Sequence, residues 1–195
     1  MKKIIQALKE NTLDVKILLS IILFATLTRI AIPSFLGHPP NFSAIDATAL
    51  FCGAYFSRRS MACLVVLLSV WMGDILLSKI VMGQWNLFYS GFYWQYGCYF
   101  LITFIGAALK DKVSPLRLAS ACLTSSIVFF GISNFGVWCS GFLYPQTVDG
   151  LITCYVSAIP FFKNTLLSDL FFTGLLFGSF NLIKITLPYN EVKQN

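Results

Sequence analysis

Charge is scarce in this chain: 11% of its 195 residues are charged, whereas 57% are hydrophobic. A soluble domain carries about a quarter charged residues, so this balance excludes an ordinary soluble fold and indicates a protein that crosses a lipid bilayer several times. The net charge of +6 does not indicate nucleic-acid binding, because the basic residues flank apolar segments and form no basic face.

Histidines and closely spaced cysteines are also lacking. The single histidine, His38, excludes a histidine-based metal centre, and the six cysteines show no C-x-x-C spacing and lie mostly within apolar runs. We therefore expect no zinc site, no disulfide framework and no cofactor. The sequence shows no Ser/His/Asp order, G-x-S-x-G, H-E-x-x-H or Gly-rich phosphate loop, so we do not expect an enzyme.

The chain does have long apolar runs, at 17–32, 44–56, 61–77, 91–109, 118–139 and 165–185. They predict an all-α polytopic membrane protein with one six-helix transmembrane bundle over 17–185. Residues 1–16 then form an N-terminal segment and 186–195 a tail. The basic N-terminus resembles the start of a signal peptide, but no A-x-A cleavage pattern follows, so we expect the first helix to be retained.

Two segments fit this pattern poorly. As a helix, 44–56 rises about 20 Å, short of a hydrocarbon core of about 30 Å. We therefore expect it to tilt in a thinned bilayer, to extend through Arg58 or to break near Pro39 and Pro40. The stretch 151–162 is too short to span and ends near Pro160, so we interpret it as an interfacial or re-entrant segment.

The distribution of Lys and Arg predicts the orientation, because cytoplasmic loops carry the excess. With both termini in the cytoplasm, the inner side holds eleven basic residues and the outer side three. The protein is therefore expected in the inner (cytoplasmic) membrane. The inner set is Lys2, Lys3, Lys9, Lys16, Arg58, Arg59, Lys110, Lys112, Arg117, Lys184 and Lys193, and the outer set is Arg29, Lys79 and Lys163.

Four predicted spans carry a polar residue near their outer ends, at depths under about 8 Å: Arg29, Asp74, Asn134 and Asp169. A charged group costs about 2.5–3.5 kcal/mol at the bilayer centre and usually faces the bundle interior, so we expect these side chains to converge. The outer loops add aromatic residues, which predicts an outward-facing pocket. From the residues alone, the candidate ligand contacts are Arg29, Asp74, Trp85, Trp94, Tyr96, Asn134, Trp138, Lys163, Asn164 and Asp169.

Structural roles stay open for the same residues. Asn164 and Thr165 are also consistent with a helix N-cap, with Asp169 complementing the positive helix end. Arg29 is also consistent with a snorkelling residue at the membrane interface or with an ion pair to Asp74 or Asp169. The tryptophans and tyrosines are typical of an interfacial belt. A membrane scaffold or assembly subunit that does not transport is therefore the alternative function.

Several stretches resemble a family of small six-helix bacterial membrane proteins, which in turn is similar to the substrate-binding S components of energy-coupling-factor (ECF) vitamin transporters. They are HPPNFSAIDATALFCGAYF (38–56), GD (73–74), SNFGVW (133–138), YPQTVDGLITCYVSAIPFFKNTLLSDLFF (144–172) and TGLLFG (173–178). The resemblance implies an S-component-like fold that binds a small organic micronutrient, such as a vitamin, from outside. It adds Asn41 and Tyr144 to the candidate contacts.

The chain departs from that pattern in places. The first helix lacks the A-x-x-x-A patch with which S components dock onto an ECF energising module, which argues against such a partner. Solitary proteins of this type carry cobalamin, and a cysteine thiolate can bind cobalt, so Cys98 is a candidate cobalt ligand beside the more frequent role of a packing cysteine. Asp46 is an additional acid at the start of the second helix.

Overall fold

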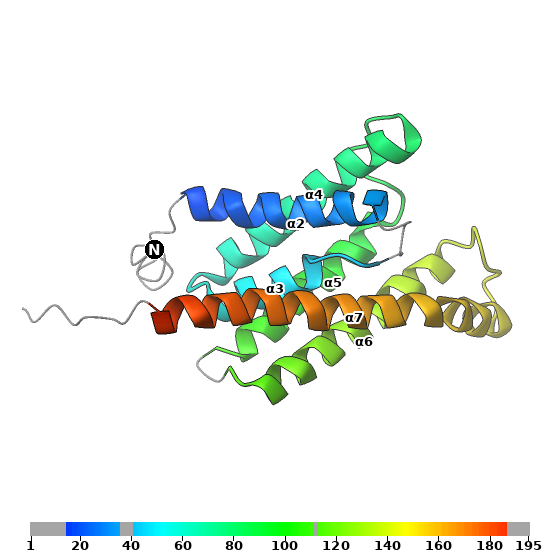
Figure 1. Cartoon of the computed structure of the whole chain (residues 1–195). Helices are drawn as coiled ribbons and strands as arrows, with labels where there is room; N and C mark the ends of the chain where they lie inside the picture. Colours follow the sequence, from blue (N-terminus) through cyan, green and yellow to red (C-terminus); the bar gives the residue numbers. More distant parts are fainter. Residues whose placement is uncertain (1–14, 36–40, 111–112, 187–195) are drawn as a thin grey trace, which may run out of the picture.

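The computed structural model describes residues 15–35, 41–110 and 113–186, and these form six helices (Figure 1). The all-helical prediction is confirmed. Three of the helices, α4, α6 and α7, are long and apolar enough to cross a membrane. The helices are α2 (Val15–Phe35), α3 (Ile45–Tyr55), α4 (Arg59–Met82), α5 (Phe92–Ala108), α6 (Pro115–Cys139) and α7 (Val148–Thr186).

The bundle has two chemically different ends. One end carries the loops α3–α4 and α5–α6 with Arg58, Arg59, Lys110 and Arg117, and we call it the basic end. The other carries the loops at 83–91 and 140–147, and we call it the aromatic end. Figure 1 places the start of α2 and the end of α7 together at the basic end, on the left. The first and last described helices therefore begin and end on the same side of the bundle, as they do in a chain that crosses a membrane an even number of times.

The short helix α3 lies in the centre of the bundle. Ten of its eleven residues, from Ile45 to Ala54, are buried, and it packs against every other described helix. Its length is about 16 Å, half the thickness of a hydrocarbon core. The helix ends at Tyr55, where the chain turns into an extended conformation at Phe56, so the predicted extension through Arg58 is wrong. Pro39 and Pro40 lie outside the described residues.

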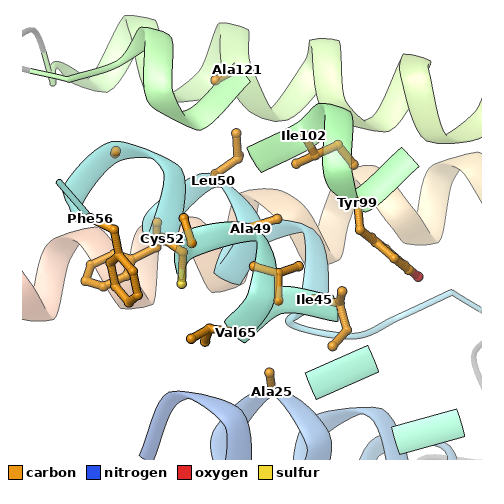
Figure 2. Packing of buried hydrophobic residues seen from close by; sticks show 14 of the residues in the cluster. Ala25, Ile45, Ala49, Leu50, Cys52, Phe56, Val65, Tyr99, Ile102 and Ala121 are labelled. Atoms are coloured by element: carbon orange, nitrogen blue, oxygen red, sulfur yellow. The ribbon is translucent and has the colours of Figure 1, made fainter. Parts of the chain in front are cut away.

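Glycines set the close packing of α3 against α5. A Cβ atom on Gly53 would lie 2.0 Å from the carbonyl oxygen of Thr103, and one on Gly106 would lie 2.3 Å from that of Leu50. Helices in membranes associate through small residues that let backbones approach in this way. Figure 2 shows the side chains of α3 beside Val65 of α4 and Ala25 of α2 on one side and beside Ile102 of α5 and Ala121 of α6 on the other.

The last helix differs from the prediction. Residues 151–162 are not a separate interfacial segment, because α7 runs continuously from Val148 to Thr186 with Pro160 inside it. Contacts to α6 hold the turns before the proline: Cys154 Sγ and Tyr155 Oη donate hydrogen bonds to carbonyl oxygens of α6, at 3.4 and 2.6 Å. These contacts tie the segment before Pro160 to α6 and so offset part of the cost of a proline inside a helix.

Two sequence-based expectations change as a result. Asn164 and Thr165 lie inside the helix and do not cap it, and Asp169 is near the middle of α7 instead of four residues from its start. At 1.5 Å per residue the 39 residues extend about 58 Å, well beyond a hydrocarbon core.

The α3–α5 contact yields a stability prediction. Gly106→Ala places a methyl group against the backbone of Leu50 and is expected to destabilise the protein by about 1–3 kcal/mol. Gly97→Ala on the same helix meets no atom within 4 Å and is expected to be neutral or to stabilise by up to about 1 kcal/mol. Thermal unfolding of both variants in detergent checks this, and equal melting temperatures would contradict the packing described.

Candidate functional site

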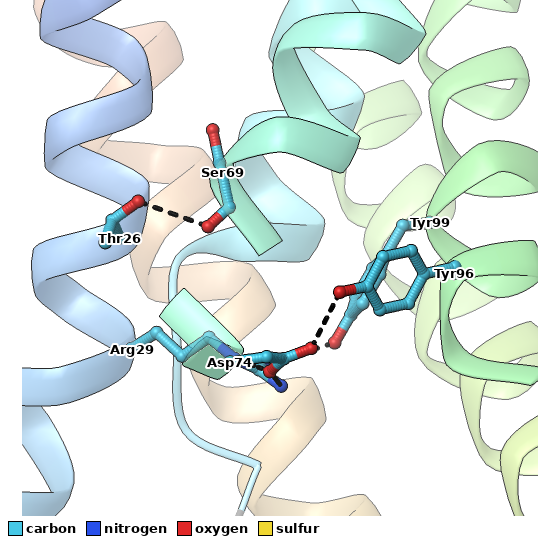
Figure 3. Close-up of polar contacts among 6 residues, drawn as sticks. All are labelled: Thr26, Arg29, Ser69, Asp74, Tyr96 and Tyr99. Atoms are coloured by element: carbon cyan, nitrogen blue, oxygen red, sulfur yellow. Dashed lines mark hydrogen bonds and ion pairs between the residues drawn. The ribbon is translucent and has the colours of Figure 1, made fainter. Parts of the chain in front are cut away.

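A buried ion pair joins α2 to α4 near the aromatic end (Figure 3). Arg29 donates to Asp74 Oδ1 from Nε at 2.8 Å and from Nη2 at 2.5 Å, and the two side chains are 15% and 7% exposed. Gly73 leaves the space that the arginine needs, since a Cβ atom there would lie 2.7 Å from Arg29 Cδ. Thr26 Oγ1 donates to the carbonyl oxygen of Ser69 one turn away, at 3.1 Å.

Tyrosines surround this pair. Tyr96 Oη donates to Asp74 Oδ2 at 3.1 Å, and Arg29 Nη1 donates to Tyr99 Oη at 3.5 Å. Tyr89 lies near the pair in the loop at 83–91, where burial and then the charge of Asp74 raise the pKa of its hydroxyl. Arg29 thus pairs with Asp74, one of the two partners considered from the sequence.

Asp169 belongs to a second polar cluster, deeper in the bundle. Its carboxyl group is fully buried and accepts a hydrogen bond from Ser126 Oγ of α6 at 2.5 Å. The side chain of Asp46 in α3 is 5% exposed and interacts with the carboxyl group of Asp169, and the neighbouring residues Ala47 and Phe172 pack in one buried cluster. Among the described residues, Oδ1 of each aspartate is buried without a hydrogen-bond partner. We call Asp46 and Asp169 the carboxyl pair.

The predicted convergence of polar residues is therefore partly found. Arg29, Asp74 and Asp169 all point into the bundle, and the charge of Arg29 also acts on Asp46. Asn134 does not join them, because its Nδ2 donates to the carbonyl oxygen of Phe130 in its own helix at 2.8 Å.

The aromatic candidates hold the aromatic end together. Trp85 is 62% exposed, with Lys79 Nζ 5.5 Å from its ring centroid. Trp94 packs on Gly136 and on the ring of Phe135. Trp138 Nε1 donates to the carbonyl oxygens of the 140–147 loop, at 3.0 and 3.2 Å.

The remaining candidates are separate from both polar clusters. Asn41 is exposed with a φ of 62°, and its carbonyl oxygen accepts a hydrogen bond from Ser168 Oγ at 3.5 Å. Lys163 is exposed on α7, whereas Asn164 and Tyr144 are half-buried. The thiol of Cys98 has no exposed surface and belongs to the hydrophobic core.

A cavity of about 880 Å³ lies at the basic end between α3, α6 and α7. Cys122 and Thr173 are the most buried of its lining residues, and Thr173 Oγ1 has no hydrogen-bond partner among the described residues. None of the twelve ligand contacts predicted from the sequence lines it. The cavity is lined by Ala54, Tyr55, Ser57, Lys110, Val113, Ser114, Pro115, Leu118, Ala119, Cys122, Leu170, Thr173, Gly174, Phe177, Gly178, Phe180 and Asn181.

One sequence signal for this cavity was available. Gly174 and Gly178 form a G-x-x-x-G spacing, which in membrane helices usually marks a contact between helices. Here a Cβ atom on either glycine would meet no atom within 4 Å, and both glycines line the cavity. The missing side chains leave open space in place of a helix contact.

The ion pair yields a second prediction. Asp74→Leu or Arg29→Met alone leaves a buried charge without its partner and is expected to cost about 3–5 kcal/mol. The double variant Arg29→Met, Asp74→Leu removes both charges and is expected to be more stable than either single variant. Unfolding of the three variants in detergent forms the test, and additive losses would show that the two charges do not stabilise each other.

Comparison with known proteins gives one match. Residues 9–190 match a family of unknown function, DUF6580. No curated protein and no solved structure matches the chain. Because the match covers nearly the whole sequence, the chain belongs to the DUF6580 family.

Proposed function

We propose that this protein is an integral membrane carrier that binds a small organic molecule of micronutrient size and helps to deliver it across the inner membrane. Binding takes place from the aromatic end, which faces outward, and release takes place at the basic end, which faces the cytoplasm together with both termini. The excess of Lys and Arg at the basic end supports this orientation.

The observation that carries the proposal is the half-open cavity of about 880 Å³ between α3, α6 and α7. Pockets for small organic ligands measure about 300–1,000 Å³ and combine apolar walls with a few polar groups. This cavity has that character: Tyr55, Phe177 and Phe180 supply aromatic surface, whereas Thr173 and Asn181 supply hydrogen-bonding groups.

The two ends of the bundle differ in a way that suits alternating access. The cavity lies at the basic end, whereas at the aromatic end Arg29, Asp74 and Tyr96 are bonded to one another and Trp138 is bonded to its loop. In the proposed cycle this conformation releases the molecule. The candidate residues at the aromatic end contact the bound molecule in the other conformation, in which the hydrogen bonds between them are broken and this end is open to the outside.

The resemblance to S components of ECF vitamin transporters fits this proposal and suggests a vitamin as the cargo. Because the first helix lacks the A-x-x-x-A patch, the proposed carrier works without a standard ECF energising module. Cys98 is not part of the proposed site, since its thiol is buried in the hydrophobic core.

The alternative function is a membrane scaffold. The buried ion pair of Arg29 and Asp74 favours it, because a scaffold needs its interior charges paired. A scaffold gives no role to a half-open cavity of this size between three helices, however. A substitution that fills the cavity therefore separates the two functions.

A ligand screen tests the proposal. Purified protein in detergent is heated in the presence of each water-soluble vitamin, cobalamin included. A ligand at a hundredfold excess over its Kd stabilises the folded state by about 2.7 kcal/mol, so we expect at least one vitamin to raise the melting temperature. Failure of all vitamins to do so would contradict the proposed cargo class.

A matched pair of variants locates the binding. Gly174→Leu places a side chain in the cavity and is expected to abolish the stabilisation by the vitamin without unfolding the protein. Gly97→Leu, which lies outside the cavity and has equal free space at its Cβ, is expected to keep it. The same loss in both variants would exclude the cavity as the binding site.

A further inference from the structure

We propose that the carboxyl pair, Asp46 and Asp169, is a proton-binding site that exchanges its proton with water through the cavity. This makes the carrier proton-coupled, a step that rests on the function proposed above, whereas the proton site itself does not depend on it.

The position of the two aspartates supports this assignment. They come from helices α3 and α7, far apart in sequence, and both are buried near the middle of the bundle. The one described cation near them, Arg29, is already paired with Asp74 through two hydrogen bonds. Two carboxylates that share one buried site do not both ionise, because their repulsion and lost hydration are too costly. The pair therefore holds at least one proton.

The groups that face the pair do not compete for this proton. They are Arg29 from α2, Cys98 and Tyr99 from α5, and Cys122 from α6. Asp74 of α4 forms the ion pair with Arg29 and does not act on either aspartate of the pair. An arginine stays charged, and an unperturbed thiol or phenol loses its proton only above about pH 8 or 10. The aspartates are thus the exchangeable groups of this set.

A short path connects the pair to the cavity. Thr173, four residues after Asp169 and so one turn along α7, is a buried lining residue of the cavity, and its hydroxyl has no partner among the described residues. On the facing helix, Cys122 also lines the cavity, and its Sγ donates to the carbonyl oxygen of Asp169 at 3.6 Å. The cavity therefore ends about one helical turn from the carboxyl groups.

The chemical step is a simple protonation. A proton passes from water in the cavity to a carboxylate oxygen, so that a carboxyl–carboxylate pair of charge −1 becomes two neutral carboxyl groups, with no change in any carbon–oxygen bond. A neutral pair removes the repulsion between α3 and α7 and the cost of a charge inside the membrane. Proton binding thereby favours the conformation in which these helices stay together.

Infrared spectroscopy of the full-length protein in liposomes tests the proton site without any cargo. The wild type is expected to show the carbonyl stretch of a protonated buried carboxyl group at neutral pH. Asp46→Asn and Asp169→Asn should each remove or shift this band, whereas Asp149→Asn, at an exposed acid in the first turn of α7, should leave it unchanged. Absence of the band, or its persistence unshifted in both variants, overturns the proposal and leaves the two acids with structural roles only.

A second pair of variants keeps the test valid if the aspartate variants do not fold. Ser126→Ala removes the hydrogen bond to Asp169 Oδ2 and should shift the band to higher frequency. Ser125→Ala, at the equally buried neighbour whose hydroxyl has no described partner, should not shift it. Equal spectra for the two serine variants count against the assignment of the band to Asp169.

Exchange into heavy water tests the path. The proposed route runs through the cavity. Gly174→Leu should therefore slow the rate at which the band shifts after transfer to heavy water at least tenfold relative to Gly97→Leu. Equal rates overturn the route through the cavity. None of these measurements needs a cargo. A failed vitamin screen therefore contradicts the proposed function but not the proton site. A missing infrared band contradicts the proton site but not the proposed function.

Discussion

The burial of the short helix α3 is the constraint on which the rest of the structure depends. A helix of eleven residues cannot reach both faces of a bilayer, so other helices must surround it. Backbone contacts at Gly53 and Gly106 fix it against α5. This position brings Asp46, in its first turn, to α7, and it leaves the space beyond Tyr55 open to the cavity. Both proposed sites thus follow from one packing arrangement.

The charged side chains in the interior of the bundle are compensated in two ways. Arg29 and Asp74 neutralise each other and tie α2 to α4, which is the usual arrangement for a buried ion pair. Asp46 and Asp169 have no cation of their own among the described residues, and in our proposal they share a proton, with a hydrogen bond from Ser126 to Asp169. A pair that depends on a proton can change its charge during a transport cycle, whereas a pair made with arginine cannot. In the proposed carrier, this difference separates the structural ion pair from the proton-binding carboxyl pair.

The sequence predicted the helices and the inward direction of Arg29, Asp74 and Asp169, because hydropathy and the cost of charge in lipid act locally and strongly. It did not predict the continuity of α7 through Pro160, which depends on hydrogen bonds from Cys154 and Tyr155 to α6. It also gave no role to Asp46, because the partner of a buried acid depends on how helices cross. The cavity was missed for the same reason, since a G-x-x-x-G spacing does not show whether another helix covers it.

The most direct test of the carrier is the access of water to the cavity. A cysteine is placed at Ala119, which lines the cavity, or at Leu123, one turn further along α6 and outside it, in a chain whose own six cysteines are replaced. A membrane-impermeant thiol reagent is then added from either side of oriented vesicles. The account predicts that the cysteine at 119 reacts from the cytoplasmic side and the cysteine at 123 from neither. Failure of the cysteine at 119 to react from the cytoplasmic side would contradict an open cavity and favour a closed scaffold.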